Sequence, residues 1–517
     1  MSSPNRITSG FNVSTPKSTE TSLDTIVALA KRRGFIFQGS EIYGGLAGTW
    51  DYGHYGLILK RNIMRLWWKM FVEDRDDMFG VDAAILMNQK VWQASGHVAT
   101  FVDPMVEDLL THQRYRADHL LKEKGFSVDG LNLLGMTKLI REHNVKSPDG
   151  NALSDAQTFN MMFKTVVGPK YTSLDRKTSG GLSGRIEFLN GKNRELAFDV
   201  NDEFSELGGF MIYDTQSISY LRPETAQGIF TNFKNIVDTM HPELPFGIAQ
   251  QGKAFRNEIR PRDFIFRARE FEQMEIEYFV HPDEWQSSFE KWIELTHKWC
   301  EAIGLPKSSV HELEVSDSDR AHYSKRTVDF EFDFPIGREE LSGLAYRTSF
   351  DLDNIARESK QRIEYVPRDG GKPFIPHVIE PSFGVERAFM AVLTSAYHEE
   401  KVGEDDTRVV LKFKPELAPV KLAVSPLLRN KPELVSKARE VYAAMKKKYG
   451  NVMYDDNGNI GKRYRRQDEI GTPLCLVIDF ETLTDEAVTV RHRDTMEQTR
   501  VKISDLTTEI DKLLEAF

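Results

Sequence analysis

Residues 253–258, Lys-Ala-Phe-Arg-Asn-Glu, and residues 266–275, Phe-Arg-Ala-Arg-Glu-Phe-Glu-Gln-Met-Glu, decide the fold of this chain. They predict two strands joined by a short polar loop. Side chains alternate along a strand, so the second strand should present two different faces. One face would carry Arg267, Arg269, Phe271, Gln273 and Glu275, and the other Glu270, Glu272, Met274 and Ile276.

The side chains of this hairpin suit a nucleotide. A guanidinium such as that of Arg256 is permanently charged and offers paired donors to a phosphate. The carboxylate of Glu258 can accept a hydrogen bond from an adenine amino group, and the ring of Phe271 can cover a base. The alternative is a surface hairpin with many ion pairs, because runs of charge are usually solvated.

The composition is that of a globular protein with several domains. A chain of 517 residues is too long for one core. The net charge of −10, from 68 basic and 78 acidic residues, argues against a protein that binds nucleic acid over most of its surface, but it allows a local basic face. The two cysteines, Cys300 and Cys475, give no disulfide framework or cysteine-based zinc site, which fits a reducing compartment.

The sequence also predicts where the protein resides. No run of about 18 apolar residues occurs, so we expect no membrane span. Residues 1–20 lack an apolar stretch and are rich in Ser, Thr, Asn and Pro, which predicts a disordered tail and no secretory signal. The single arginine, Arg6, leaves organelle targeting as an alternative that the sequence favours less. We therefore expect a cytoplasmic protein.

Periodicity divides the rest of the chain. Helices are expected over 22–33 and 57–72, the second with a wide apolar face that is core by default. Residues 92–102 alternate weakly and should end as a strand at Pro104. Turn residues punctuate short alternating runs over about 120–216, which predicts an insertion of small strands.

A change of composition near residues 399–419 predicts a domain boundary at 404/405. Strands and helices alternate after it, which is typical of a small α/β domain. We expect strands over 420–424, 452–454 and 474–480, a hairpin over 487–501, and helices over 431–448, 461–470 and 503–514. The fold class is therefore α/β (α+β), with residues 21–404 as one part and 405–517 as the other.

Three further segments combine acids with arginines. The first, Arg222-Pro-Glu224, can be explained as a helix start with Pro223 and Glu224 in the first turn. The second, residues 339–352, can be explained as a strand with a glycine. The third, residues 379–387, precedes a helix over 385–393 with Arg387 in its first turn. A cation is disfavoured there, which suggests an anionic ligand nearby.

Together these segments resemble motifs 2 and 3 of the class II aminoacyl-tRNA synthetases. The whole set is similar to the homodimeric glycyl-tRNA synthetase family, in the family's order, from about residue 23 to the C-terminus. The matching segments are Glu41-Ile-Tyr-Gly-Gly, Asp51-Tyr-Gly, Ala94-Ser-Gly-His97, Arg116-Ala-Asp118, Arg222-Pro-Glu-Thr-Ala-Gln-Gly228, Arg256-Asn-Glu258, Arg269-Glu-Phe271, Met274-Glu275 and Glu380-Pro-Ser-Phe-Gly384.

The resemblance implies an antiparallel-sheet catalytic domain with insertions and a C-terminal anticodon-binding domain. It implies that glycine and ATP form glycyl-adenylate and that glycine passes to tRNA(Gly). Arg256 would hold the α-phosphate and Arg387 the far end of the triphosphate, both as catalytic residues, and Glu340 would bind Mg²⁺. The implied ATP site comprises Arg256, Asn257, Glu258, Phe266, Arg267, Ala268, Arg269, Glu270, Phe271, Glu340, Leu341, Gly384, Val385, Glu386 and Arg387.

Glycine has no side chain to grip, so the resemblance implies recognition by exclusion. Glu224, Glu275 and Glu380 match the acids that surround the amino acid, with Ser382 beside them. These carboxylates would repel one another and raise a pKa unless a cation is present, which the bound ammonium supplies. The implied glycine site comprises Arg116, Glu224, Phe271, Glu272, Gln273, Met274, Glu275, Glu380, Pro381, Ser382, Phe383 and Gly384.

The resemblance also assigns an assembly and an RNA surface. Helix 57–72 and the strand ending at Pro104 match motif 1, the two-fold dimer interface, which would place Trp67 and Trp68 in a homodimer contact. Residues 462–466 are the expected RNA-contacting stretch of the C-terminal domain. Other basic residues available there are Lys446, Lys447, Lys448, Arg491 and Arg493.

Three departures from the family pattern stand out. His54 and Tyr55 replace the usual proline after Gly53. The cysteines that some relatives use for zinc are missing after Pro104, so zinc is not expected. Residues 170–216 are longer than the family requires, and their role is unknown.

Two other functions compete with this interpretation. A class II synthetase for serine, proline or threonine is disfavoured by the three acids matched to the amino-acid pocket. A non-catalytic nucleic-acid-binding relative would tend to lose the motif arginines, but Arg256, Glu258 and Arg387 are all present.

Overall fold

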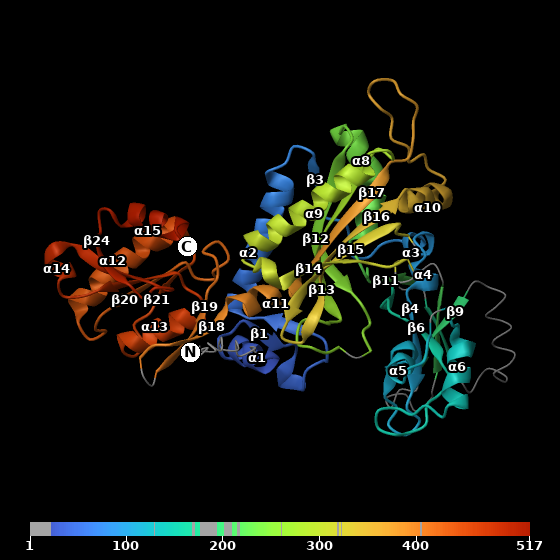
Figure 1. Cartoon of the computed structure of the whole chain (residues 1–517), viewed down its shortest axis with the longest axis horizontal. Coiled ribbons are helices and arrows are strands. Elements are labelled where there is room, and N and C mark those ends of the chain that lie inside the picture. Colours follow the sequence, from blue (N-terminus) through green and yellow to red (C-terminus); the bar gives the residue numbers. More distant parts are fainter. Residues whose placement is uncertain are drawn as a thin grey trace, which may run out of the picture.

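The computed structural model describes residues 22–517, except 129, 168–170, 176–193, 201–208, 215–217, 260, 318–319, 322 and 404–405. The tail expected over 1–20 and the boundary placed at 404/405 fall outside the described residues. Figure 1 shows a central sheet with a C-terminal unit (red) on one side and a small unit (cyan) on the other. None of the helices that the structure describes is long and apolar enough to span a membrane.

The central sheet has seven strands in the order β14-β15-β16-β17-β13-β12-β3. All neighbours are antiparallel except the short edge strand β3, which runs parallel to β12. The strands are β14 (Val310–Glu314), β15 (Arg326–Phe334), β16 (Gly337–Thr348), β17 (His377–Gly384), β13 (Glu270–Val280), β12 (Phe246–Phe255) and β3 (Met78–Gly80).

The predicted hairpin is β12 and β13, paired from Phe246↔Phe279 to Phe255↔Glu270. The alternation is confirmed from residue 270 onward. Met274 and Ile276 lie in the large core under α2 (His54–Trp68), α9 (Trp285–Ala302) and α11 (Val385–Ala396). Arg267 and Arg269 precede the strand, because the loop extends further than the pattern predicted.

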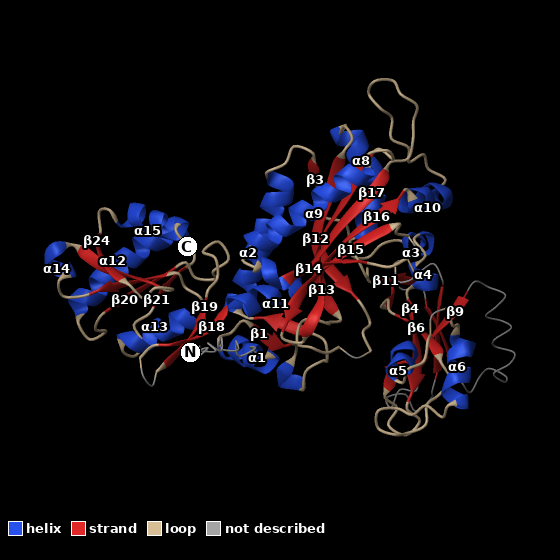
Figure 2. Ribbon diagram, viewed as in Figure 1, coloured by secondary structure: helices blue, strands red, loops and turns tan. Residues whose placement is uncertain are grey.

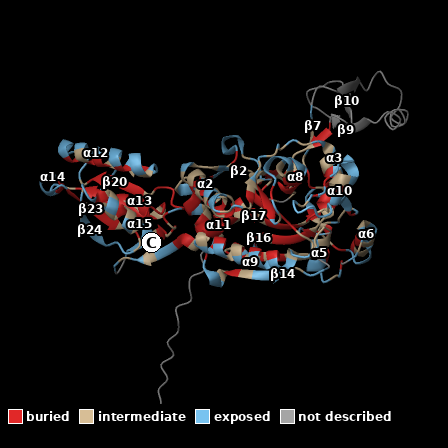
Figure 3. Ribbon diagram, turned by 90° about the horizontal axis from the view of Figure 1, so that it is seen from above, coloured by how far each residue is buried: buried red, intermediate tan, exposed pale blue. Residues whose placement is uncertain are grey.

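The opposite face of the sheet is covered by α8 (Ala226–Met240) and α10 (Phe350–Ser359) through a second apolar cluster that includes Phe233, Phe279 and Leu352. Figure 3 shows the buried strands at the centre of the molecule. Helix α8 begins three residues later than Pro223, with Thr225 at its N-cap. Pro223 and Glu224 therefore lie before the helix and not in its first turn.

The N-terminal helices follow their sequence signals. In α1 (Leu23–Arg32), Ser22 caps the N-terminus by accepting from the Thr25 amide, and Gly34 follows with a positive φ of 72°. The expected helix 57–72 is α2 with a π-helical turn over Lys69–Glu73. Its Trp67 is fully buried against Phe71 and Phe383 in the chain's own core, so the interface assignment of Trp67 is wrong. Trp68 is half-buried and lies against Gly80.

The strand expected over 92–104 is also wrong. Residues 89–100 form two short helices, α3 (Gln89–Ala94) and α4 (His97–Thr100), and β4 (Val102–Glu107) runs straight through Pro104. On one side Pro104 pairs with Thr158 of β6. On the other side it has no partner in β5, because the pairing of β4 with β5 begins only at Met105. No donor is required of the proline there.

Strand β4 belongs to the small unit, which inserts between α4 and the central sheet. It pairs with β5 (Arg114–Arg116) and β6 (Gln157–Asn160), and α5 (Ala117–Glu123) and α6 (Leu133–Glu142) complete an apolar cluster. The unit thus begins near residue 102, earlier than the 120 expected. Strands β7 (Lys164–Val166) and β11 (Ile218–Tyr220) pair with each other, one before and one after the stretch 167–217.

Within 167–217 the small strands predicted from turn residues are confirmed for three described segments. These are β8 (Tyr171–Asp175), β9 (Arg194–Val200) and β10 (Gly209–Asp214), in the order β8-β10-β9. The other residues from 168 to 217 are not among those that the structure describes.

The C-terminal unit matches its prediction closely. A five-stranded sheet, β21-β20-β22-β23-β24, carries helices on its faces (Figure 2). Its elements are β20 (Leu422–Pro426), α12 (Pro432–Tyr449), β21 (Val452–Tyr454), α13 (Ile460–Glu469), β22 (Leu474–Ile478), α14 (Thr482–Asp485), β23 (Ala487–His492), β24 (Gln498–Lys502) and α15 (Leu506–Glu515). Only the short α14 had no counterpart in the prediction.

Two kinds of contact join this unit to the rest. The hairpin β18 (Tyr397–Lys401) and β19 (Thr407–Leu411) leads into it, and buried Arg408 donates to the Arg493 carbonyl at 2.8 Å. The N-terminal helices also reach it. Arg33 pairs with Glu469 on α13, and the Tyr55 hydroxyl lies 3.6 Å from Met453 Sδ.

Candidate active site

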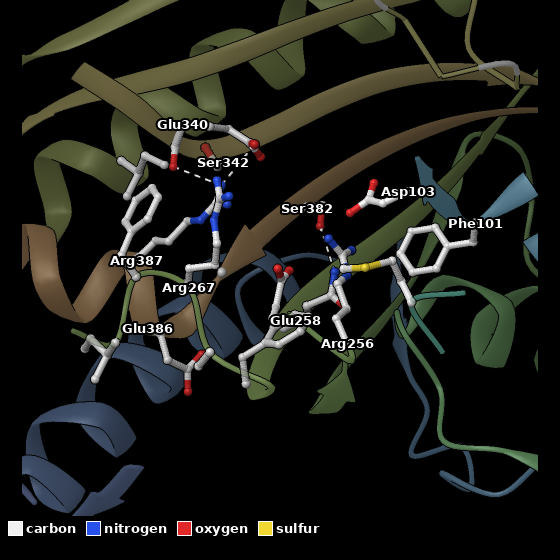
Figure 4. Close-up of a pocket in the computed structure, with 18 of the residues that line it drawn as sticks. Phe101, Asp103, Arg256, Glu258, Arg267, Glu340, Ser342, Ser382, Glu386 and Arg387 are labelled. Carbon is white, nitrogen blue, oxygen red and sulfur yellow. Dashed lines mark hydrogen bonds and ion pairs between the residues drawn. The ribbon is translucent and has the colours of Figure 1, made fainter. Parts of the chain in front are cut away.

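A cavity of about 410 Å³ opens where β12, β13, β16 and β17 meet the start of α11. The small unit closes its far side through Phe101, Asp103 and Arg116. Figure 4 shows Arg387, Arg267 and Glu340 on one side of this cavity and Arg256 with Phe101 on the other. Its further lining residues include Glu258, Phe266, Ala268, Phe271, Gln273, Leu341, Ser342, Ser382, Gly384 and Glu386.

Arg256 follows the last residue of β12, where the end of the strand sets its direction. Its Nε donates to the Pro223 carbonyl at 3.2 Å, and its guanidinium lies 5.5 Å and 5.3 Å from the ring centroids of Phe101 and Phe271. This holds the side chain between two rings while the cavity remains accessible to its other nitrogens. A phosphate in the cavity would meet a preoriented cation.

Glu258 lies two residues further on and is half-buried. Burial raises its pKa, while the charges of Arg267 and Arg256 act against that rise. Arg116, expected beside glycine, instead forms ion pairs with Asp103 at 2.9 Å and Asp118 at 2.7 Å, and its charge acts on Glu258. The structure therefore places Arg116 at the Glu258 end of the cavity.

The other end of the cavity is built on the first turn of α11. Arg387 forms an ion pair with Glu340 at 3.0 Å and donates to the Glu340 carbonyl at 3.0 Å. The guanidinium also lies 4.7 Å from the Phe266 ring centroid. Arg387 is thus held over the cavity by β16, at the N-terminus of a helix, where an anion would be favoured.

Glu340 has a second carboxylate beside it. A Cβ placed on Gly343 would lie 3.7 Å from Asp329 Oδ1 and 3.9 Å from Glu340 Oε1, so both carboxylates approach the same point of β16. Burial, followed by the charges of Glu340 and Glu331, raises the pKa of Asp329 to about 7. A cation would relieve this repulsion, which fits Mg²⁺ at Glu340. Among the described residues, however, no three His, Cys, Asp or Glu side chains converge to hold a metal ion by themselves.

The expected acids meet at the floor of the cavity, behind Gln273 and Ser382. Glu275 is buried and accepts from the Ser382 hydroxyl at 2.9 Å and from the Thr225 amide at 3.1 Å. Gln273 Nε2 lies 3.3 Å from Glu275 Oε1, which ties the floor to the cavity. Burial and the charge of Glu224 raise the pKa of Glu275.

Glu224 and Glu380 each have a partner within the protein itself. His97 Nε2 lies 3.3 Å from Glu224 Oε2, and Arg347 Nη1 donates to Glu380 Oε1 at 2.7 Å. Burial would raise the pKa of Glu224, but attraction and hydrogen bonding to His97, together with the charges of Arg347 and Arg256, outweigh it and lower the pKa to about 2. Burial raises the pKa of Glu380 to about 8 despite Arg347.

Arg347 is the principal cation that the sequence interpretation lacked. It is 1% exposed and also pairs with Asp351 on α10 at 2.7 Å. The ammonium of a substrate is therefore not the only counter-charge for these acids, contrary to the expectation. The signal in the sequence was a lone arginine in the apolar stretch Leu344-Ala-Tyr-Arg347, because a buried charge requires partners.

Several expected site residues lie elsewhere. Glu272 forms an ion pair with Lys60 on the opposite face of β13, and Glu270 pairs with Lys253. The Arg269 side chain donates to the carbonyls of Ala47 and Glu258. Met274, Phe383 and Val385 are core residues, and Asn257 and Pro381 do not line the cavity.

Comparison with known proteins agrees with this geometry. Residues 210–397 match the tRNA synthetase class II core domain (G, H, P, S and T), and residues 421–513 match the anticodon binding domain. The chain is 43% identical to the glycine–tRNA ligase of Deinococcus radiodurans over 94% of its length and 98% of that protein. The enzyme of Thermus thermophilus is also 43% identical (94% and 97%), and that of Caldanaerobacter subterraneus subsp. tengcongensis 44% (95% and 98%).

The chain belongs to the glycine–tRNA ligase family. The class II core and the predicted fold class are thereby confirmed, and the match of the anticodon binding domain begins within one residue of β20.

In the family's anticodon-binding unit, most of the arginines expected to meet RNA have structural partners. Arg463 is 2% exposed and donates to the carbonyls of Pro426, Asp456 and Gly458. Arg491 forms a buried ion pair with Asp468 at 2.8 Å. Arg493 donates to the carbonyls of Phe413 and Gly471, and Arg465 and Arg466 pair with Asp406 and Asp455. Lys462, at the start of α13, remains an exposed cation.

Proposed function

We propose that this protein activates glycine with ATP, releasing pyrophosphate, and transfers the glycyl group to the 3′ end of tRNA(Gly). The observation that carries the proposal is the junction of the two halves of the cavity. Arg256, Phe271 and Arg387 offer a nucleotide site, and a floor of buried acids lies directly behind Gln273 and Ser382. The glycine–tRNA ligases of the relatives support the choice of substrate.

The nucleotide would lie with its base between Phe271 and Glu258 and its triphosphate between Arg256 and Arg387. Negative charge builds on the α-phosphate as the glycine carboxylate attacks, and the preoriented guanidinium of Arg256 stabilises it. The carboxylate is already ionised, so no base is required and positioning carries the step. Mg²⁺ bound at Glu340, together with phosphate oxygens, would supply further positive charge to the triphosphate.

Specificity for glycine would come from the limited space in the pocket. The glycine ammonium would enter among Glu224, Glu275 and Ser382, since Ser382 donates to Glu275 and the charge of Glu224 acts on Glu275. A larger amino acid would place its side chain against buried, ion-paired groups that cannot yield without exposing charge. Rejection of alanine and serine by shape therefore needs no separate editing site.

We extend the proposal to the setting of the enzyme. The family resemblance implies a homodimer in the cytoplasm, where ATP and tRNA are available. The anticodon-binding unit would hold the anticodon loop while the acceptor end reaches the cavity. Light scattering of the purified chain tests the dimer, with the monomer mass of 59.3 kDa as the reference.

Pyrophosphate exchange tests the reaction. Glycine should support exchange of labelled pyrophosphate into ATP, and alanine, serine, proline and threonine should not. Exchange with one of these and not with glycine would overturn the assignment. Aminoacylation of tRNA(Gly), measured beside an unrelated tRNA, separates a defect in activation from a defect in transfer.

A further inference from the structure

Glu277 is a buried carboxyl for which the activation mechanism has no role. It lies on β13 two residues beyond Glu275 and therefore on the same face of the strand. The side chain is 0% exposed, and neither of its carboxyl oxygens has a hydrogen-bond partner among the described residues. An ionised carboxylate left in that state would cost several kcal/mol.

The register of the sheet identifies the neighbour of Glu277. Strands β13 and β17 pair as Glu275↔Ser382 and Tyr278↔Ile379, so the unbroken register sets Glu277 opposite Glu380. Cross-strand Cβ atoms lie about 5 Å apart, which is within reach for two glutamates. On its other side Glu277 opposes Ile248 of β12, which offers no polar group.

The charge balance of the floor requires a proton here. The floor holds the five carboxyl groups of Glu224, Glu275, Glu277, Asp351 and Glu380. Arg347 is already shared between Asp351 and Glu380, and His97 and Arg256 act on Glu224. Two carboxyls that face each other in low dielectric cannot both ionise, so one proton between them is favoured. The ionisable groups acting on the pair are Glu224 before α8, Glu275 on β13, Tyr323 before β15, Arg347 on β16 and Asp351 on α10.

We propose that Glu277 is a positioning residue for glycine, which holds a proton against Glu380 in the empty enzyme and loses it to solvent when the glycine ammonium enters. This rests on the proposed function. The shared proton keeps the Glu380 carboxyl directed at Arg347 before substrate arrives. An ammonium among Glu224, Glu275 and Ser382 adds one positive charge, which stabilises the fully ionised pair and releases the proton.

Burial together with the charge of Glu380 raises the pKa of Glu277 well above its usual range, and the pKa of Glu380 is about 8. The pair is therefore protonated at pH 6.5 in the empty enzyme. A free α-amino group, with a pKa of roughly 7.7–8, is also protonated at that pH. Protons released at pH 6.5 would then come from the protein and not from the ligand.

The test compares two non-hydrolysable sulfamoyl analogues of the adenylate, one glycyl and one acetyl, which differ by the ammonium alone. Titration calorimetry at pH 6.5 in buffers of different protonation enthalpy gives the protons exchanged with each. The wild-type enzyme should release up to one proton more with the glycyl compound. Equal proton counts for the two compounds would overturn the proposal.

Glu277→Gln keeps the shape and a donor toward Glu380 but has no proton to lose. Its extra proton release should vanish while the glycyl analogue still binds, and persistence of the release contradicts the role of Glu277. Asp329→Asn is the matched control, because it removes another carboxyl of raised pKa from the Glu340 end of the cavity. That variant should release protons as the wild type does.

A second measurement needs no variant. Between pH 5.5 and 7 the affinity of the wild type for the glycyl analogue, relative to the acetyl analogue, should rise by up to tenfold per pH unit. A flat ratio would contradict the proposal. An enzyme that performs glycine-dependent pyrophosphate exchange yet shows a flat ratio would retain its proposed function and lose only this inference.

Discussion

Arg347→Met tests the buried ion cluster at the floor of the active site. Arg347 donates to Asp351 at 2.7 and 2.9 Å and to Glu380 at 2.7 Å, and it lies 3.8 Å from the Tyr323 ring centroid. Methionine fills most of the volume of the arginine stem, so the change removes charge without leaving a large cavity. The acids remain, buried and without their cation.

Breaking a buried pair from one side costs about 3–5 kcal/mol. At roughly 2 °C per kcal/mol for a unit of this size, the melting temperature of the catalytic part should fall by about 6–10 °C. Differential scanning calorimetry at pH 8 and pH 5 measures this. The loss should be larger at pH 8, where the uncompensated carboxyls must ionise, than at pH 5, where they can retain protons.

Two controls sharpen the result. Arg357→Met removes an exposed arginine from α10, the helix that carries Asp351, and its ion pair with Glu358 contributes about 0–1 kcal/mol. Adding Asp351→Asn to Arg347→Met removes one of the orphaned charges and should recover part of the stability. A fall of less than 2 °C at pH 8, or a larger fall at pH 5, would refute the idea that Arg347 neutralises the acids.

Three further outcomes are expected. Arg256→Ala should lower glycine-dependent pyrophosphate exchange by about 10²–10³-fold, with tRNA binding on filters nearly unchanged; equal loss of both contradicts the phosphate role. Asp329→Asn should stabilise the protein progressively between pH 4 and 7, by ~1–2 kcal/mol at pH 8 in urea unfolding. Because the pKa of Asp329 is raised in the folded protein, its carboxyl ionises at lower pH in the unfolded chain. A difference in unfolding free energy between variant and wild type that did not change with pH would contradict this raised pKa. Arg463→Ala should lower the melting temperature of the C-terminal unit, because three carbonyls lose their donor. Lys462→Ala should weaken tRNA binding in a salt-dependent way and leave the melting temperature unchanged. The reverse pattern would contradict a structural role for Arg463 and an RNA-binding role for Lys462.

Secondary structure was predicted most reliably from the sequence where the residues of one element determine it by themselves. The alternation of β13 and the helix expected over 431–448 are local patterns, and both were confirmed, the latter as α12. Pro104 misled the prediction because its tolerance depends on which side of β4 has a partner, and that partner is β6, more than 50 residues away. Trp67 was similarly ambiguous, since an apolar helix face is the same in sequence whether it meets its own core or another chain.

The site shows the same division. Arg256, Glu258 and Phe271, which belong to the quoted motifs, lie together in the lining of one cavity. The groups that tune them were missed, because they act across distant segments. His97 reaches Glu224 from another part of the chain, and Arg347 joins α10 to β17. Charge balance in a buried cluster is a property of the tertiary structure, and no single segment reveals it.

The C-terminal unit is fastened at two places that are remote in sequence. One is the β18–β19 hairpin, where Arg408 enters the unit, and the other is the N-terminal pair of helices, through Arg33 and Tyr55. With one attachment the C-terminal unit could rotate relative to the central sheet, whereas two attachments oppose that rotation. The two attachments would restrain the distance between the C-terminal unit and the cavity, so an RNA that contacted both would have to match that distance.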